Sequence, residues 1–225
     1  LPQDRYYVRG YASMLMGCAY QMAGDLDAAV ALATDGLLET PRNEMFHTRL
    51  QGMLCMVYWM DADLENLWLA ATRCLEVSQE LDAVLSLTAS RHFQGCVHYH
   101  RNDLVAAEQA FRDVIDRRYA THALTYAYSV VGLASTYQAQ GWPDRAREVV
   151  DSAITFMLET HSPVMLPVVQ AFQAELAARQ GRLAQSSRWA SQAAPSQLQQ
   201  SLPGFYGPQL ALPKVLLAQD TEESR

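Results

Sequence analysis

Apolar and polar residues alternate along this chain with the 3.6-residue period of an α-helix, in segments separated by short turns of small and polar residues. The segments form successive pairs, each with a first and a second helix. First helices are predicted at about 6–23, 45–61, 83–101, 123–140, 164–180 and 207–219. Second helices are predicted at about 26–39, 64–80, 104–118, 143–160 and 183–194. Since every periodic segment fits the helical repeat, the chain is predicted to be all-α.

The tract that joins the two helices of a pair returns at a regular interval. It begins at Tyr20 and recurs at Tyr58, His98, Tyr137 and Ala177, with a shortened copy at Leu216. The successive spacings are 38, 40, 39, 40 and 39 residues. Such a fixed period predicts a repeat protein, in which each helix pair packs only on its neighbours.

Aligned copies share small residues at three positions. The turn position holds Gly24, Ala62, Asn102, Gly141, Gly181 and Asp220. Most of these residue types suit a backbone near the left-handed region, where one helix ends and the next begins. Seven residues before the turn and five after it, the residues are small in all copies except one, which has Leu67. Two helices are therefore expected to approach closely at these positions.

The first copy resembles the tetratricopeptide repeat (TPR), whose helix pair carries Leu-Gly-x-x-Tyr on the first helix and Ala on the second. The matching residues are Met16, Gly17, Tyr20, Gly24, Asp25, Ala29, Gly36 and Pro41. The period of about 39 residues differs from the usual 34 and indicates a long-repeat variant. The second and fifth copies depart from the pattern at Cys55, Leu67 and Ala177.

The resemblance implies a right-handed, TPR-like α-solenoid of antiparallel pairs. We expect five helix pairs and one terminal helix in a single repeat domain over residues 1–225. The apolar content of 50% suffices to bury one side of each pair, and the charged content of 18% argues against disorder. Neither end has the polar outer face of a capping repeat, so we interpret the chain as a fragment of a larger protein. The last helix is then expected to expose Leu210, Leu212 and Leu216.

The charge balance argues against direct contact with nucleic acid. The net charge is −7, and Lys214 is the single lysine among 17 basic residues. Without a basic stripe, an acidic chain is a poor partner for a phosphate backbone. No apolar run reaches about 18 residues, and no signal-peptide pattern is seen. The four cysteines form no Cys-x-x-Cys pair and are interpreted as reduced thiols of a cytoplasmic protein, with disulfide or metal binding as the alternative.

The C-terminal segment carries a second resemblance. The run from Phe205 to Arg225 looks like Tyr-x-Pro-Gln-Leu-x-Leu-x-Lys-Val-Leu-Leu-Ala-Gln, a segment found late in the repeat region of MalT-like, LuxR-type transcriptional regulators. The preceding residues from Ala174 to Leu183 fit the same region. In that family an ATP-hydrolysing switch precedes the repeats, and a helix-turn-helix domain follows them. This chain has neither a phosphate loop nor a helix-turn-helix, so the resemblance implies the sensor region alone.

In TPR arrays the first helices line a concave groove, and transfer by register gives a set of candidate binding residues. They are Tyr11, Met14, Gln21, Arg49, Met56, Trp59, Met60, His92, Tyr99, His100, Tyr128, Gln138, Glu175 and Arg179. A surface rich in aromatic residues and methionine is typical of sites for small molecules or peptides. The alternative is that these side chains simply pack between neighbouring repeats.

A metal site and a catalytic site are both less favoured interpretations. His92, Cys96 and His100 lie four residues apart on one helical face, with ligand types that suit zinc. The three positions span about 12 Å along a helix, so one ion does not easily meet both outer ligands. No serine, cysteine, histidine and carboxylate arrangement predicts a nucleophile with its base. We therefore expect no metal, no cofactor and no enzymatic activity.

Two functional hypotheses follow from the sequence. The first is the effector-sensing region of a MalT-like regulator, which binds a small molecule or a regulatory protein in its groove. The second is a general protein-interaction scaffold, attached to a kinase, a cyclase or another signalling module. A phosphate loop before the repeats and a helix-turn-helix after them would favour the regulator.

Overall fold

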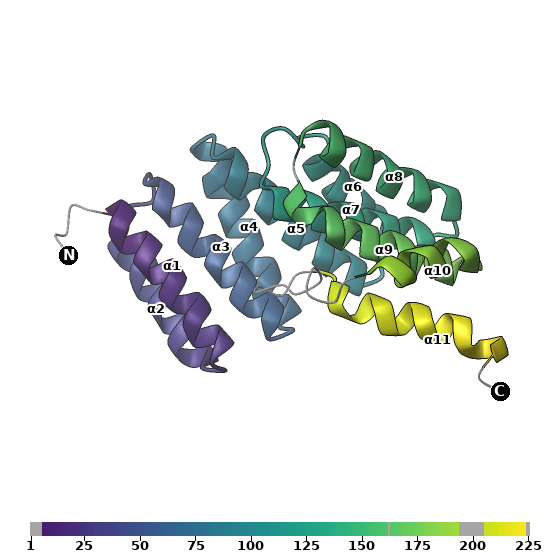
Figure 1. The fold of residues 1–225 in the computed structure, drawn as a ribbon. Helices are drawn as coiled ribbons and strands as arrows, with labels where there is room; N and C mark the ends of the chain where they lie inside the picture. Colours follow the sequence, from purple (N-terminus) through teal and green to yellow (C-terminus); the bar gives the residue numbers. More distant parts are fainter. Residues whose placement is uncertain (1–5, 162, 194–204, 224–225) are drawn as a thin grey trace. The chain divides into compact units, whose positions relative to one another are not determined.

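The computed structural model describes residues 6–161, 163–193 and 205–223. In this part of the chain the regular structure is entirely helical (Figure 1). The helices are α1 (Tyr6–Met22), α2 (Leu26–Glu39), α3 (Met45–Met60), α4 (Leu64–Glu80), α5 (Val84–His100), α6 (Leu104–Ile115), α7 (Ala123–Ala139), α8 (Pro143–Glu159), η1 (Pro163–Met165), α9 (Leu166–Arg179), α10 (Leu183–Gln192), η3 (Pro208–Leu210) and α11 (Ala211–Glu223). The prediction of an all-α repeat of helix pairs is confirmed.

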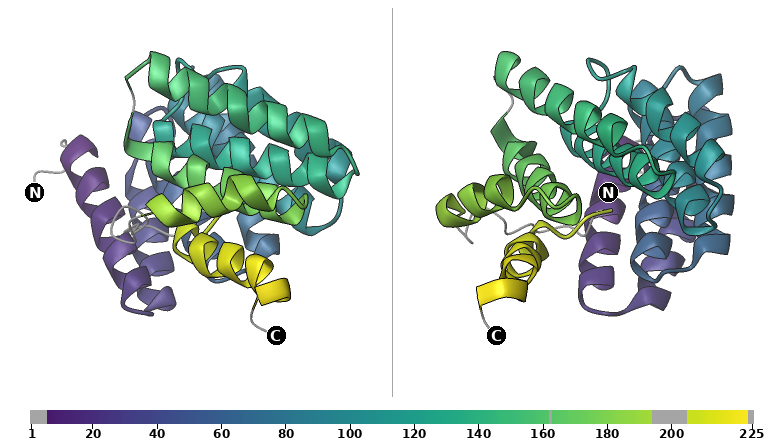
Figure 2. Two further views of the ribbon diagram at one scale, coloured as in Figure 1. Left: turned by 45° about the vertical axis from the view of Figure 1, so that its right-hand side comes forward. Right: turned by 90° about the vertical axis from the view of Figure 1, so that its right-hand side faces the viewer.

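The helices divide into two compact units. Unit 1 comprises the described residues of 1–103 together with 116–121, and unit 2 those of 104–115 and 122–225. In unit 1, α1 packs on α2 and α3 on α4, and each following first helix packs on the pair before it. In unit 2, α7 packs on α6 and α8, and α9 packs on α8, α10 and α11. Figure 2 shows α11 beside α9 and α10.

The turns between paired helices adopt the backbone that their residues predict. Gly24, Gly141 and Gly181 have φ values of +81°, +78° and +74°, and Ala62 and Asn102 have φ values of +58° and +59°. In the first two pairs, Asp25 and Asp63 then cap the second helix by accepting hydrogen bonds from the backbone N–H groups of Ala28 and Asn66. The turn predicted at Asp220 is wrong, since α11 continues to Glu223. This segment has no glycine or asparagine that would end a helix there.

Two further left-handed residues were missed by the sequence analysis. Asp82 and His161 follow second helices and have φ values of +52° and +50°. The links after second helices vary in length and sequence, so they give no repeated signal. The predicted helix limits agree with the structure to within four residues, and the largest differences are at the two ends of α11, Ala211 and Glu223.

The small residues of the repeat are buried in the described helices. The residues five positions after the turn, namely Ala29, Leu67, Ala107, Ala146 and Ser186, have no exposed surface. Those seven positions before it, Gly17, Cys55, Gly95, Ala134 and Ala174, are buried as well. In unit 1 these positions join a core of Ala29, Ala33, Met53, Leu54, Cys55, Val57, Leu67, Ala70, Ala71 and Val97. Within the units, α1 packs on α2, α3 on α4, α7 on α8 and α9 on α10, as the small residues at these positions predicted.

The last helix exposes part of its apolar surface, as the sequence analysis expected. Leu210 and Leu216 are about half exposed, whereas Leu212 is partly buried. In the part of the chain that the structure describes, no helix combines the length and the apolar character needed to cross a membrane.

We expect Gly132→Ala to destabilise the protein, because an alanine Cβ there would lie 2.5–2.8 Å from the ring of Phe111. Such overpacking costs about 1–3 kcal/mol. The matched control is Gly52→Ala, in the middle of α3, where a Cβ would meet no atom within 4 Å. That change should stabilise by about 0.5–1 kcal/mol through helix propensity alone. Urea denaturation of both variants measures the difference, and equal effects would contradict the tight α6–α7 contact.

Candidate binding surface on the first helices

A cluster of partly exposed aromatic and methionine side chains lies on two first helices of unit 1. It consists of Met56, Trp59 and Met60 on α3 and Tyr99 and His100 on α5, and we call it the α3–α5 aromatic surface. The ring centroids of Trp59 and His100 are 5.5 Å apart, and those of Tyr99 and His100 are 5.7 Å apart. The repeat period places Trp59 and Tyr99, and likewise Met60 and His100, at matching positions on consecutive first helices.

Trp59 has two environments at once. It packs against the buried core of unit 1 and keeps part of its surface exposed. A tryptophan held in this way offers a large apolar area in a fixed orientation, which is the property of residues that dominate binding interfaces. Its side chain is therefore both a packing residue and a candidate contact residue.

The other candidates in unit 1 are spread over α1 and α3. Tyr11 and Arg49 are exposed, and Met14 is partly buried against the unit 1 core. Gln21 is partly buried, and its Oε1 atom is buried without a hydrogen-bond partner among the described residues.

His92 and Cys96 form a buried pair on α5. The Sγ atom of Cys96 lies 3.5 Å from Nε2 of His92, and both residues are buried. Burial lowers the pKa of His92 to about 4 and raises the pKa of the Cys96 thiol well above its usual value. Both groups are therefore neutral near pH 7, which is the state of packed side chains rather than of an activated thiolate.

The geometry of α5 also bears on the zinc hypothesis. His100 is exposed and its ring contacts Trp59 and Tyr99, whereas His92 is buried two turns away. Across the described ranges, no three histidine, cysteine, aspartate or glutamate side chains converge as a metal site would require.

The candidates in unit 2 are mostly covered. Tyr128 is fully buried, and burial raises the pKa of its hydroxyl to about 12. Gln138 is partly buried and accepts a hydrogen bond of 2.8 Å from Nε2 of Gln180. The ring of Tyr128 is therefore not available to a ligand in this structure. The sequence analysis missed this because the repeat register predicts which face of a helix a residue occupies, but not what covers that face.

Glu175 is a buried carboxylate that the chain itself engages. Its Oε1 atom accepts hydrogen bonds from Arg179 and from Nζ of Lys214, the latter at 3.0 Å. Lys214 lies on α11 and sits 5.9 Å from the ring centroid of Tyr206. Two partly exposed cations thus compensate one buried anion and tie α11 to α9, as a buried charge requires.

The segment before α11 adds aromatic contacts to this arrangement. The ring of Tyr206 packs edge-on against Phe172 at 5.2 Å, and the ring of Phe205 packs on Phe111 at 5.7 Å. Tyr206 is buried, and both its burial and the negative charge of Glu175 raise the pKa of its hydroxyl. The chain therefore supplies its own cover for the Glu175 candidate in unit 2, and sequence periodicity contained no signal for this contact.

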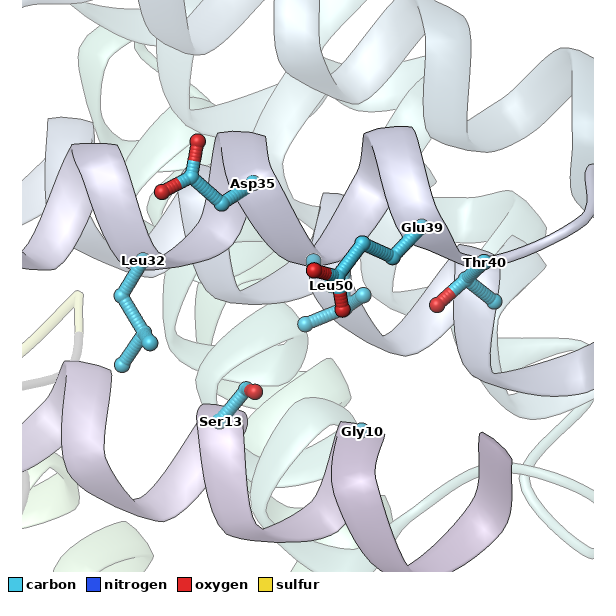
Figure 3. Close-up of a pocket in the computed structure, with 8 residues that line it drawn as sticks. Gly10, Ser13, Leu32, Asp35, Glu39, Thr40 and Leu50 are labelled. Carbon is cyan, nitrogen blue, oxygen red and sulfur yellow. The ribbon is translucent and has the colours of Figure 1, made fainter. Parts of the chain in front are cut away.

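A small cavity lies between α1 and α2, and none of the predicted residues is among those that line it. Its volume is about 200 Å³, and its lining includes Ser13, Leu32, Asp35 and Glu39. Ser13 and Glu39 point toward the space between the two helices (Figure 3). Sites for drug-sized ligands usually occupy about 300–1,000 Å³, so this cavity is small for such a ligand. In the sequence, the only indication of this cavity was a pair of acidic residues, Asp35 and Glu39, four positions apart on a second helix.

No protein-family model matches the sequence, and no curated protein matches it either. Solved structures are similar in fold. A kinesin-light-chain-like protein of Podosopora anserina with nearly identical TPR-like repeats superposes with a TM-score of 0.63 at 14% identity, over 100% of this chain and 99% of that chain. A variant of that protein with one glutamine replaced by methionine has a TM-score of 0.63 at 14% identity, over 96% of each chain. The fold of this chain is therefore TPR-like.

We expect acid to destabilise the protein through His92. Its pKa is about 4 when folded and about 6.5 when unfolded, so the unfolded chain binds the proton more tightly. The stability is complete above pH 6.5 and falls as the pH drops toward 4, by about 2 kcal/mol at pH 5. Urea denaturation between pH 7.5 and 5 measures this slope.

The matched variants for this prediction are His92→Gln and His161→Asn. His92→Gln should flatten the pH dependence, although it also lowers stability at pH 7.5 by disturbing a buried site. His161 is exposed with a left-handed backbone, which asparagine tolerates, so His161→Asn should keep the wild-type slope. An unchanged slope in His92→Gln would show that His92 is not the group responsible.

Proposed function

We propose that the α3–α5 aromatic surface binds a peptide or protein segment. The observation that supports this proposal is the contact of Trp59 with His100, which joins two consecutive first helices into one partly exposed aromatic surface flanked by Met56 and Met60. Rigid aromatic side chains provide binding energy at a small entropic cost, and methionine adapts its shape to the partner. TPR-like arrays commonly bind partners on their first helices, and the fold agrees with such a role.

The shape of the candidate surface favours a peptide over an enclosed small molecule. Small ligands are usually surrounded by a pocket, whereas these side chains lie on the outside of two helices. The cavity between α1 and α2 is small, and it lies apart from this surface. An extended segment that lays apolar side chains over Trp59 and Tyr99 would use the exposed area best.

We place this binding surface in the sensor region of a MalT-like, LuxR-type transcriptional regulator. The support is the resemblance of the segment from Tyr206 to Gln219 to the late repeat region of that family. On this proposal a regulatory protein or an inducer binds the repeats and changes the activity of modules elsewhere in a larger protein. The expected location is the cytoplasm, and this segment makes no contact with DNA.

A second candidate function is a protein-interaction scaffold attached to a kinase, a cyclase or another signalling module. The observation that favours it is the structural similarity to kinesin-light-chain-like TPR-like repeats over the whole chain. Both candidates use a protein-binding surface on the first helices, and they differ in the modules that the repeats serve. The modules encoded beside this region in its gene would distinguish them.

We expect Trp59→Ala to weaken binding of a selected peptide by at least about 30-fold, as loss of an interface hot spot does. A peptide is first selected from a random library on the wild-type chain, and its affinity is then measured by fluorescence anisotropy. The matched control is Trp68→Ala, because Trp68 is also partly buried but lies on the second helix α4, with its ring against His98 and beneath Arg101. This control should leave the affinity unchanged.

Thermal melts of both variants separate binding from stability. Trp59→Ala should cost less than the roughly 3–5 kcal/mol of a fully buried aromatic truncation, since part of its surface is already exposed. A strongly destabilised Trp59→Ala protein that still binds the peptide with wild-type affinity would remove Trp59 from the binding surface and overturn the proposal.

A further inference from the structure

The helix α1 exposes a set of apolar side chains that its repeat position would normally bury. Val8, Leu15 and Met16 have exposed fractions of 43%, 53% and 50%. They lie at helical spacing on one side of α1, and we call them the α1 face. Water contact by several large apolar side chains on one helix is unfavourable and marks an interaction surface.

The same positions are buried one repeat later. The residues 38 positions further on are Phe46, Met53 and Leu54 on α3, with exposed fractions of 5%, 3% and 8%. They are buried because α3 packs on both α1 and α2. The α1 face therefore has the apolar residues of a repeat interface. Among the described residues, no helix pair covers it in the way that α1 and α2 cover the equivalent residues of α3.

The contacts of α3 show what kind of surface these side chains need. The ring of Phe46 fills the space beside Gly10, and the side chain of Met53 fills the space beside Gly17, so that a Cβ at either glycine would clash. Leu50 packs beside Gly36 on α2, where a Cβ would lie 3.1 Å from it. Phe46, Leu50 and Met53 of α3 thus pack where the preceding pair has a glycine.

The next first helix repeats this interface with different residues. On α5, Val97 joins the buried core formed by α3 and α4, and Ser86 forms a hydrogen bond of 2.9 Å with Thr48 of α3. Val97 and Ser86 are the counterparts of Ala19 and Val8 on α1. In unit 1, the equivalent face of α3 is therefore covered by α1 and α2, and that of α5 by α3 and α4.

We propose that the α1 face is a docking surface for one further antiparallel helix pair of the same repeat type. The pair presents small residues at the positions that Gly10, Gly17 and Gly36 hold, and it receives Val8 and Leu15 as α1 and α2 receive Phe46 and Met53. A second copy of this chain is a poor occupant, because its own α3 already fills the spaces beside Gly10, Gly17 and Gly36. This surface is separate from the α3–α5 aromatic surface.

The test adds such a pair to the whole chain. A second copy of residues 6–44, which contains α1, α2 and the following link, is fused directly before Tyr6, so that the original α1 follows it as α3 follows α2. The midpoint of thermal unfolding, measured by circular dichroism, should rise. Leu15→Ala should lower the midpoint by less than about 2 °C in the unextended chain, where Leu15 is half exposed, and by roughly 5–15 °C in the extended chain.

The matched control carries leucine in place of the glycine equivalent to Gly17 within the added copy. It should remove the gain, because the space for Leu15 is then filled. Equal effects of Leu15→Ala in the two chains, or no rise on extension, would overturn the proposal. Sedimentation equilibrium of the unextended chain tests the other occupant: a dimer that Leu15→Glu dissolves would assign the α1 face to a second copy instead. None of these results depends on whether Trp59 binds a peptide.

Discussion

The close approach of two helices within each pair is the constraint on which the rest of this structure depends. It requires small side chains at two positions, seven residues before the turn and five after it, and these residues are buried in every described pair. The one large exception, Leu67, is also fully buried and lies with Cys55 in the unit 1 core. Because the contact is made so near the turn, the left-handed residue between the helices and the small residues on them act together. A larger side chain at either site has to find room between the helices, as Leu67 does in the unit 1 core, or it shifts the side chains that depend on their spacing.

From this constraint follows the placement of functional side chains. Once consecutive pairs stack with the same geometry, residues about 39 positions apart lie on matching faces of neighbouring first helices. Trp59 on α3 matches Tyr99 on α5 in this way, and the ring of Trp59 meets that of the next residue, His100, although none of these residues defines the repeat. Binding side chains can therefore change from repeat to repeat while the buried small residues keep the scaffold. On α1, the first helix of the described residues, the same positions carry exposed apolar side chains.

The repeat pattern predicted the helices, the turns between paired helices and the small buried residues. Helical periodicity and turn chemistry are local properties, and here they agree with the packing. The same pattern could not predict that Tyr128 and Glu175 are buried, since that depends on which segments lie over them. The segment from Phe205 to Lys214 begins the last, shortened repeat, and the repeat period does not specify its contacts with Phe111, Phe172 and Glu175. A single continuous repeat domain and the link to a MalT-like regulator stay predictions.

The position of Lys214 in α11 also makes this helix easy to follow by protease digestion. Lys214 is the only lysine in the chain, so a lysine-specific protease has one bond to cut, between Lys214 and Val215. That bond lies within α11, and the side chain of Val215 is fully buried. Proteases need an extended backbone, so cleavage there requires α11 to unfold locally. The rate of this single cut therefore reports how often the helix opens, and it reads one local equilibrium of the chain without any label or substitution.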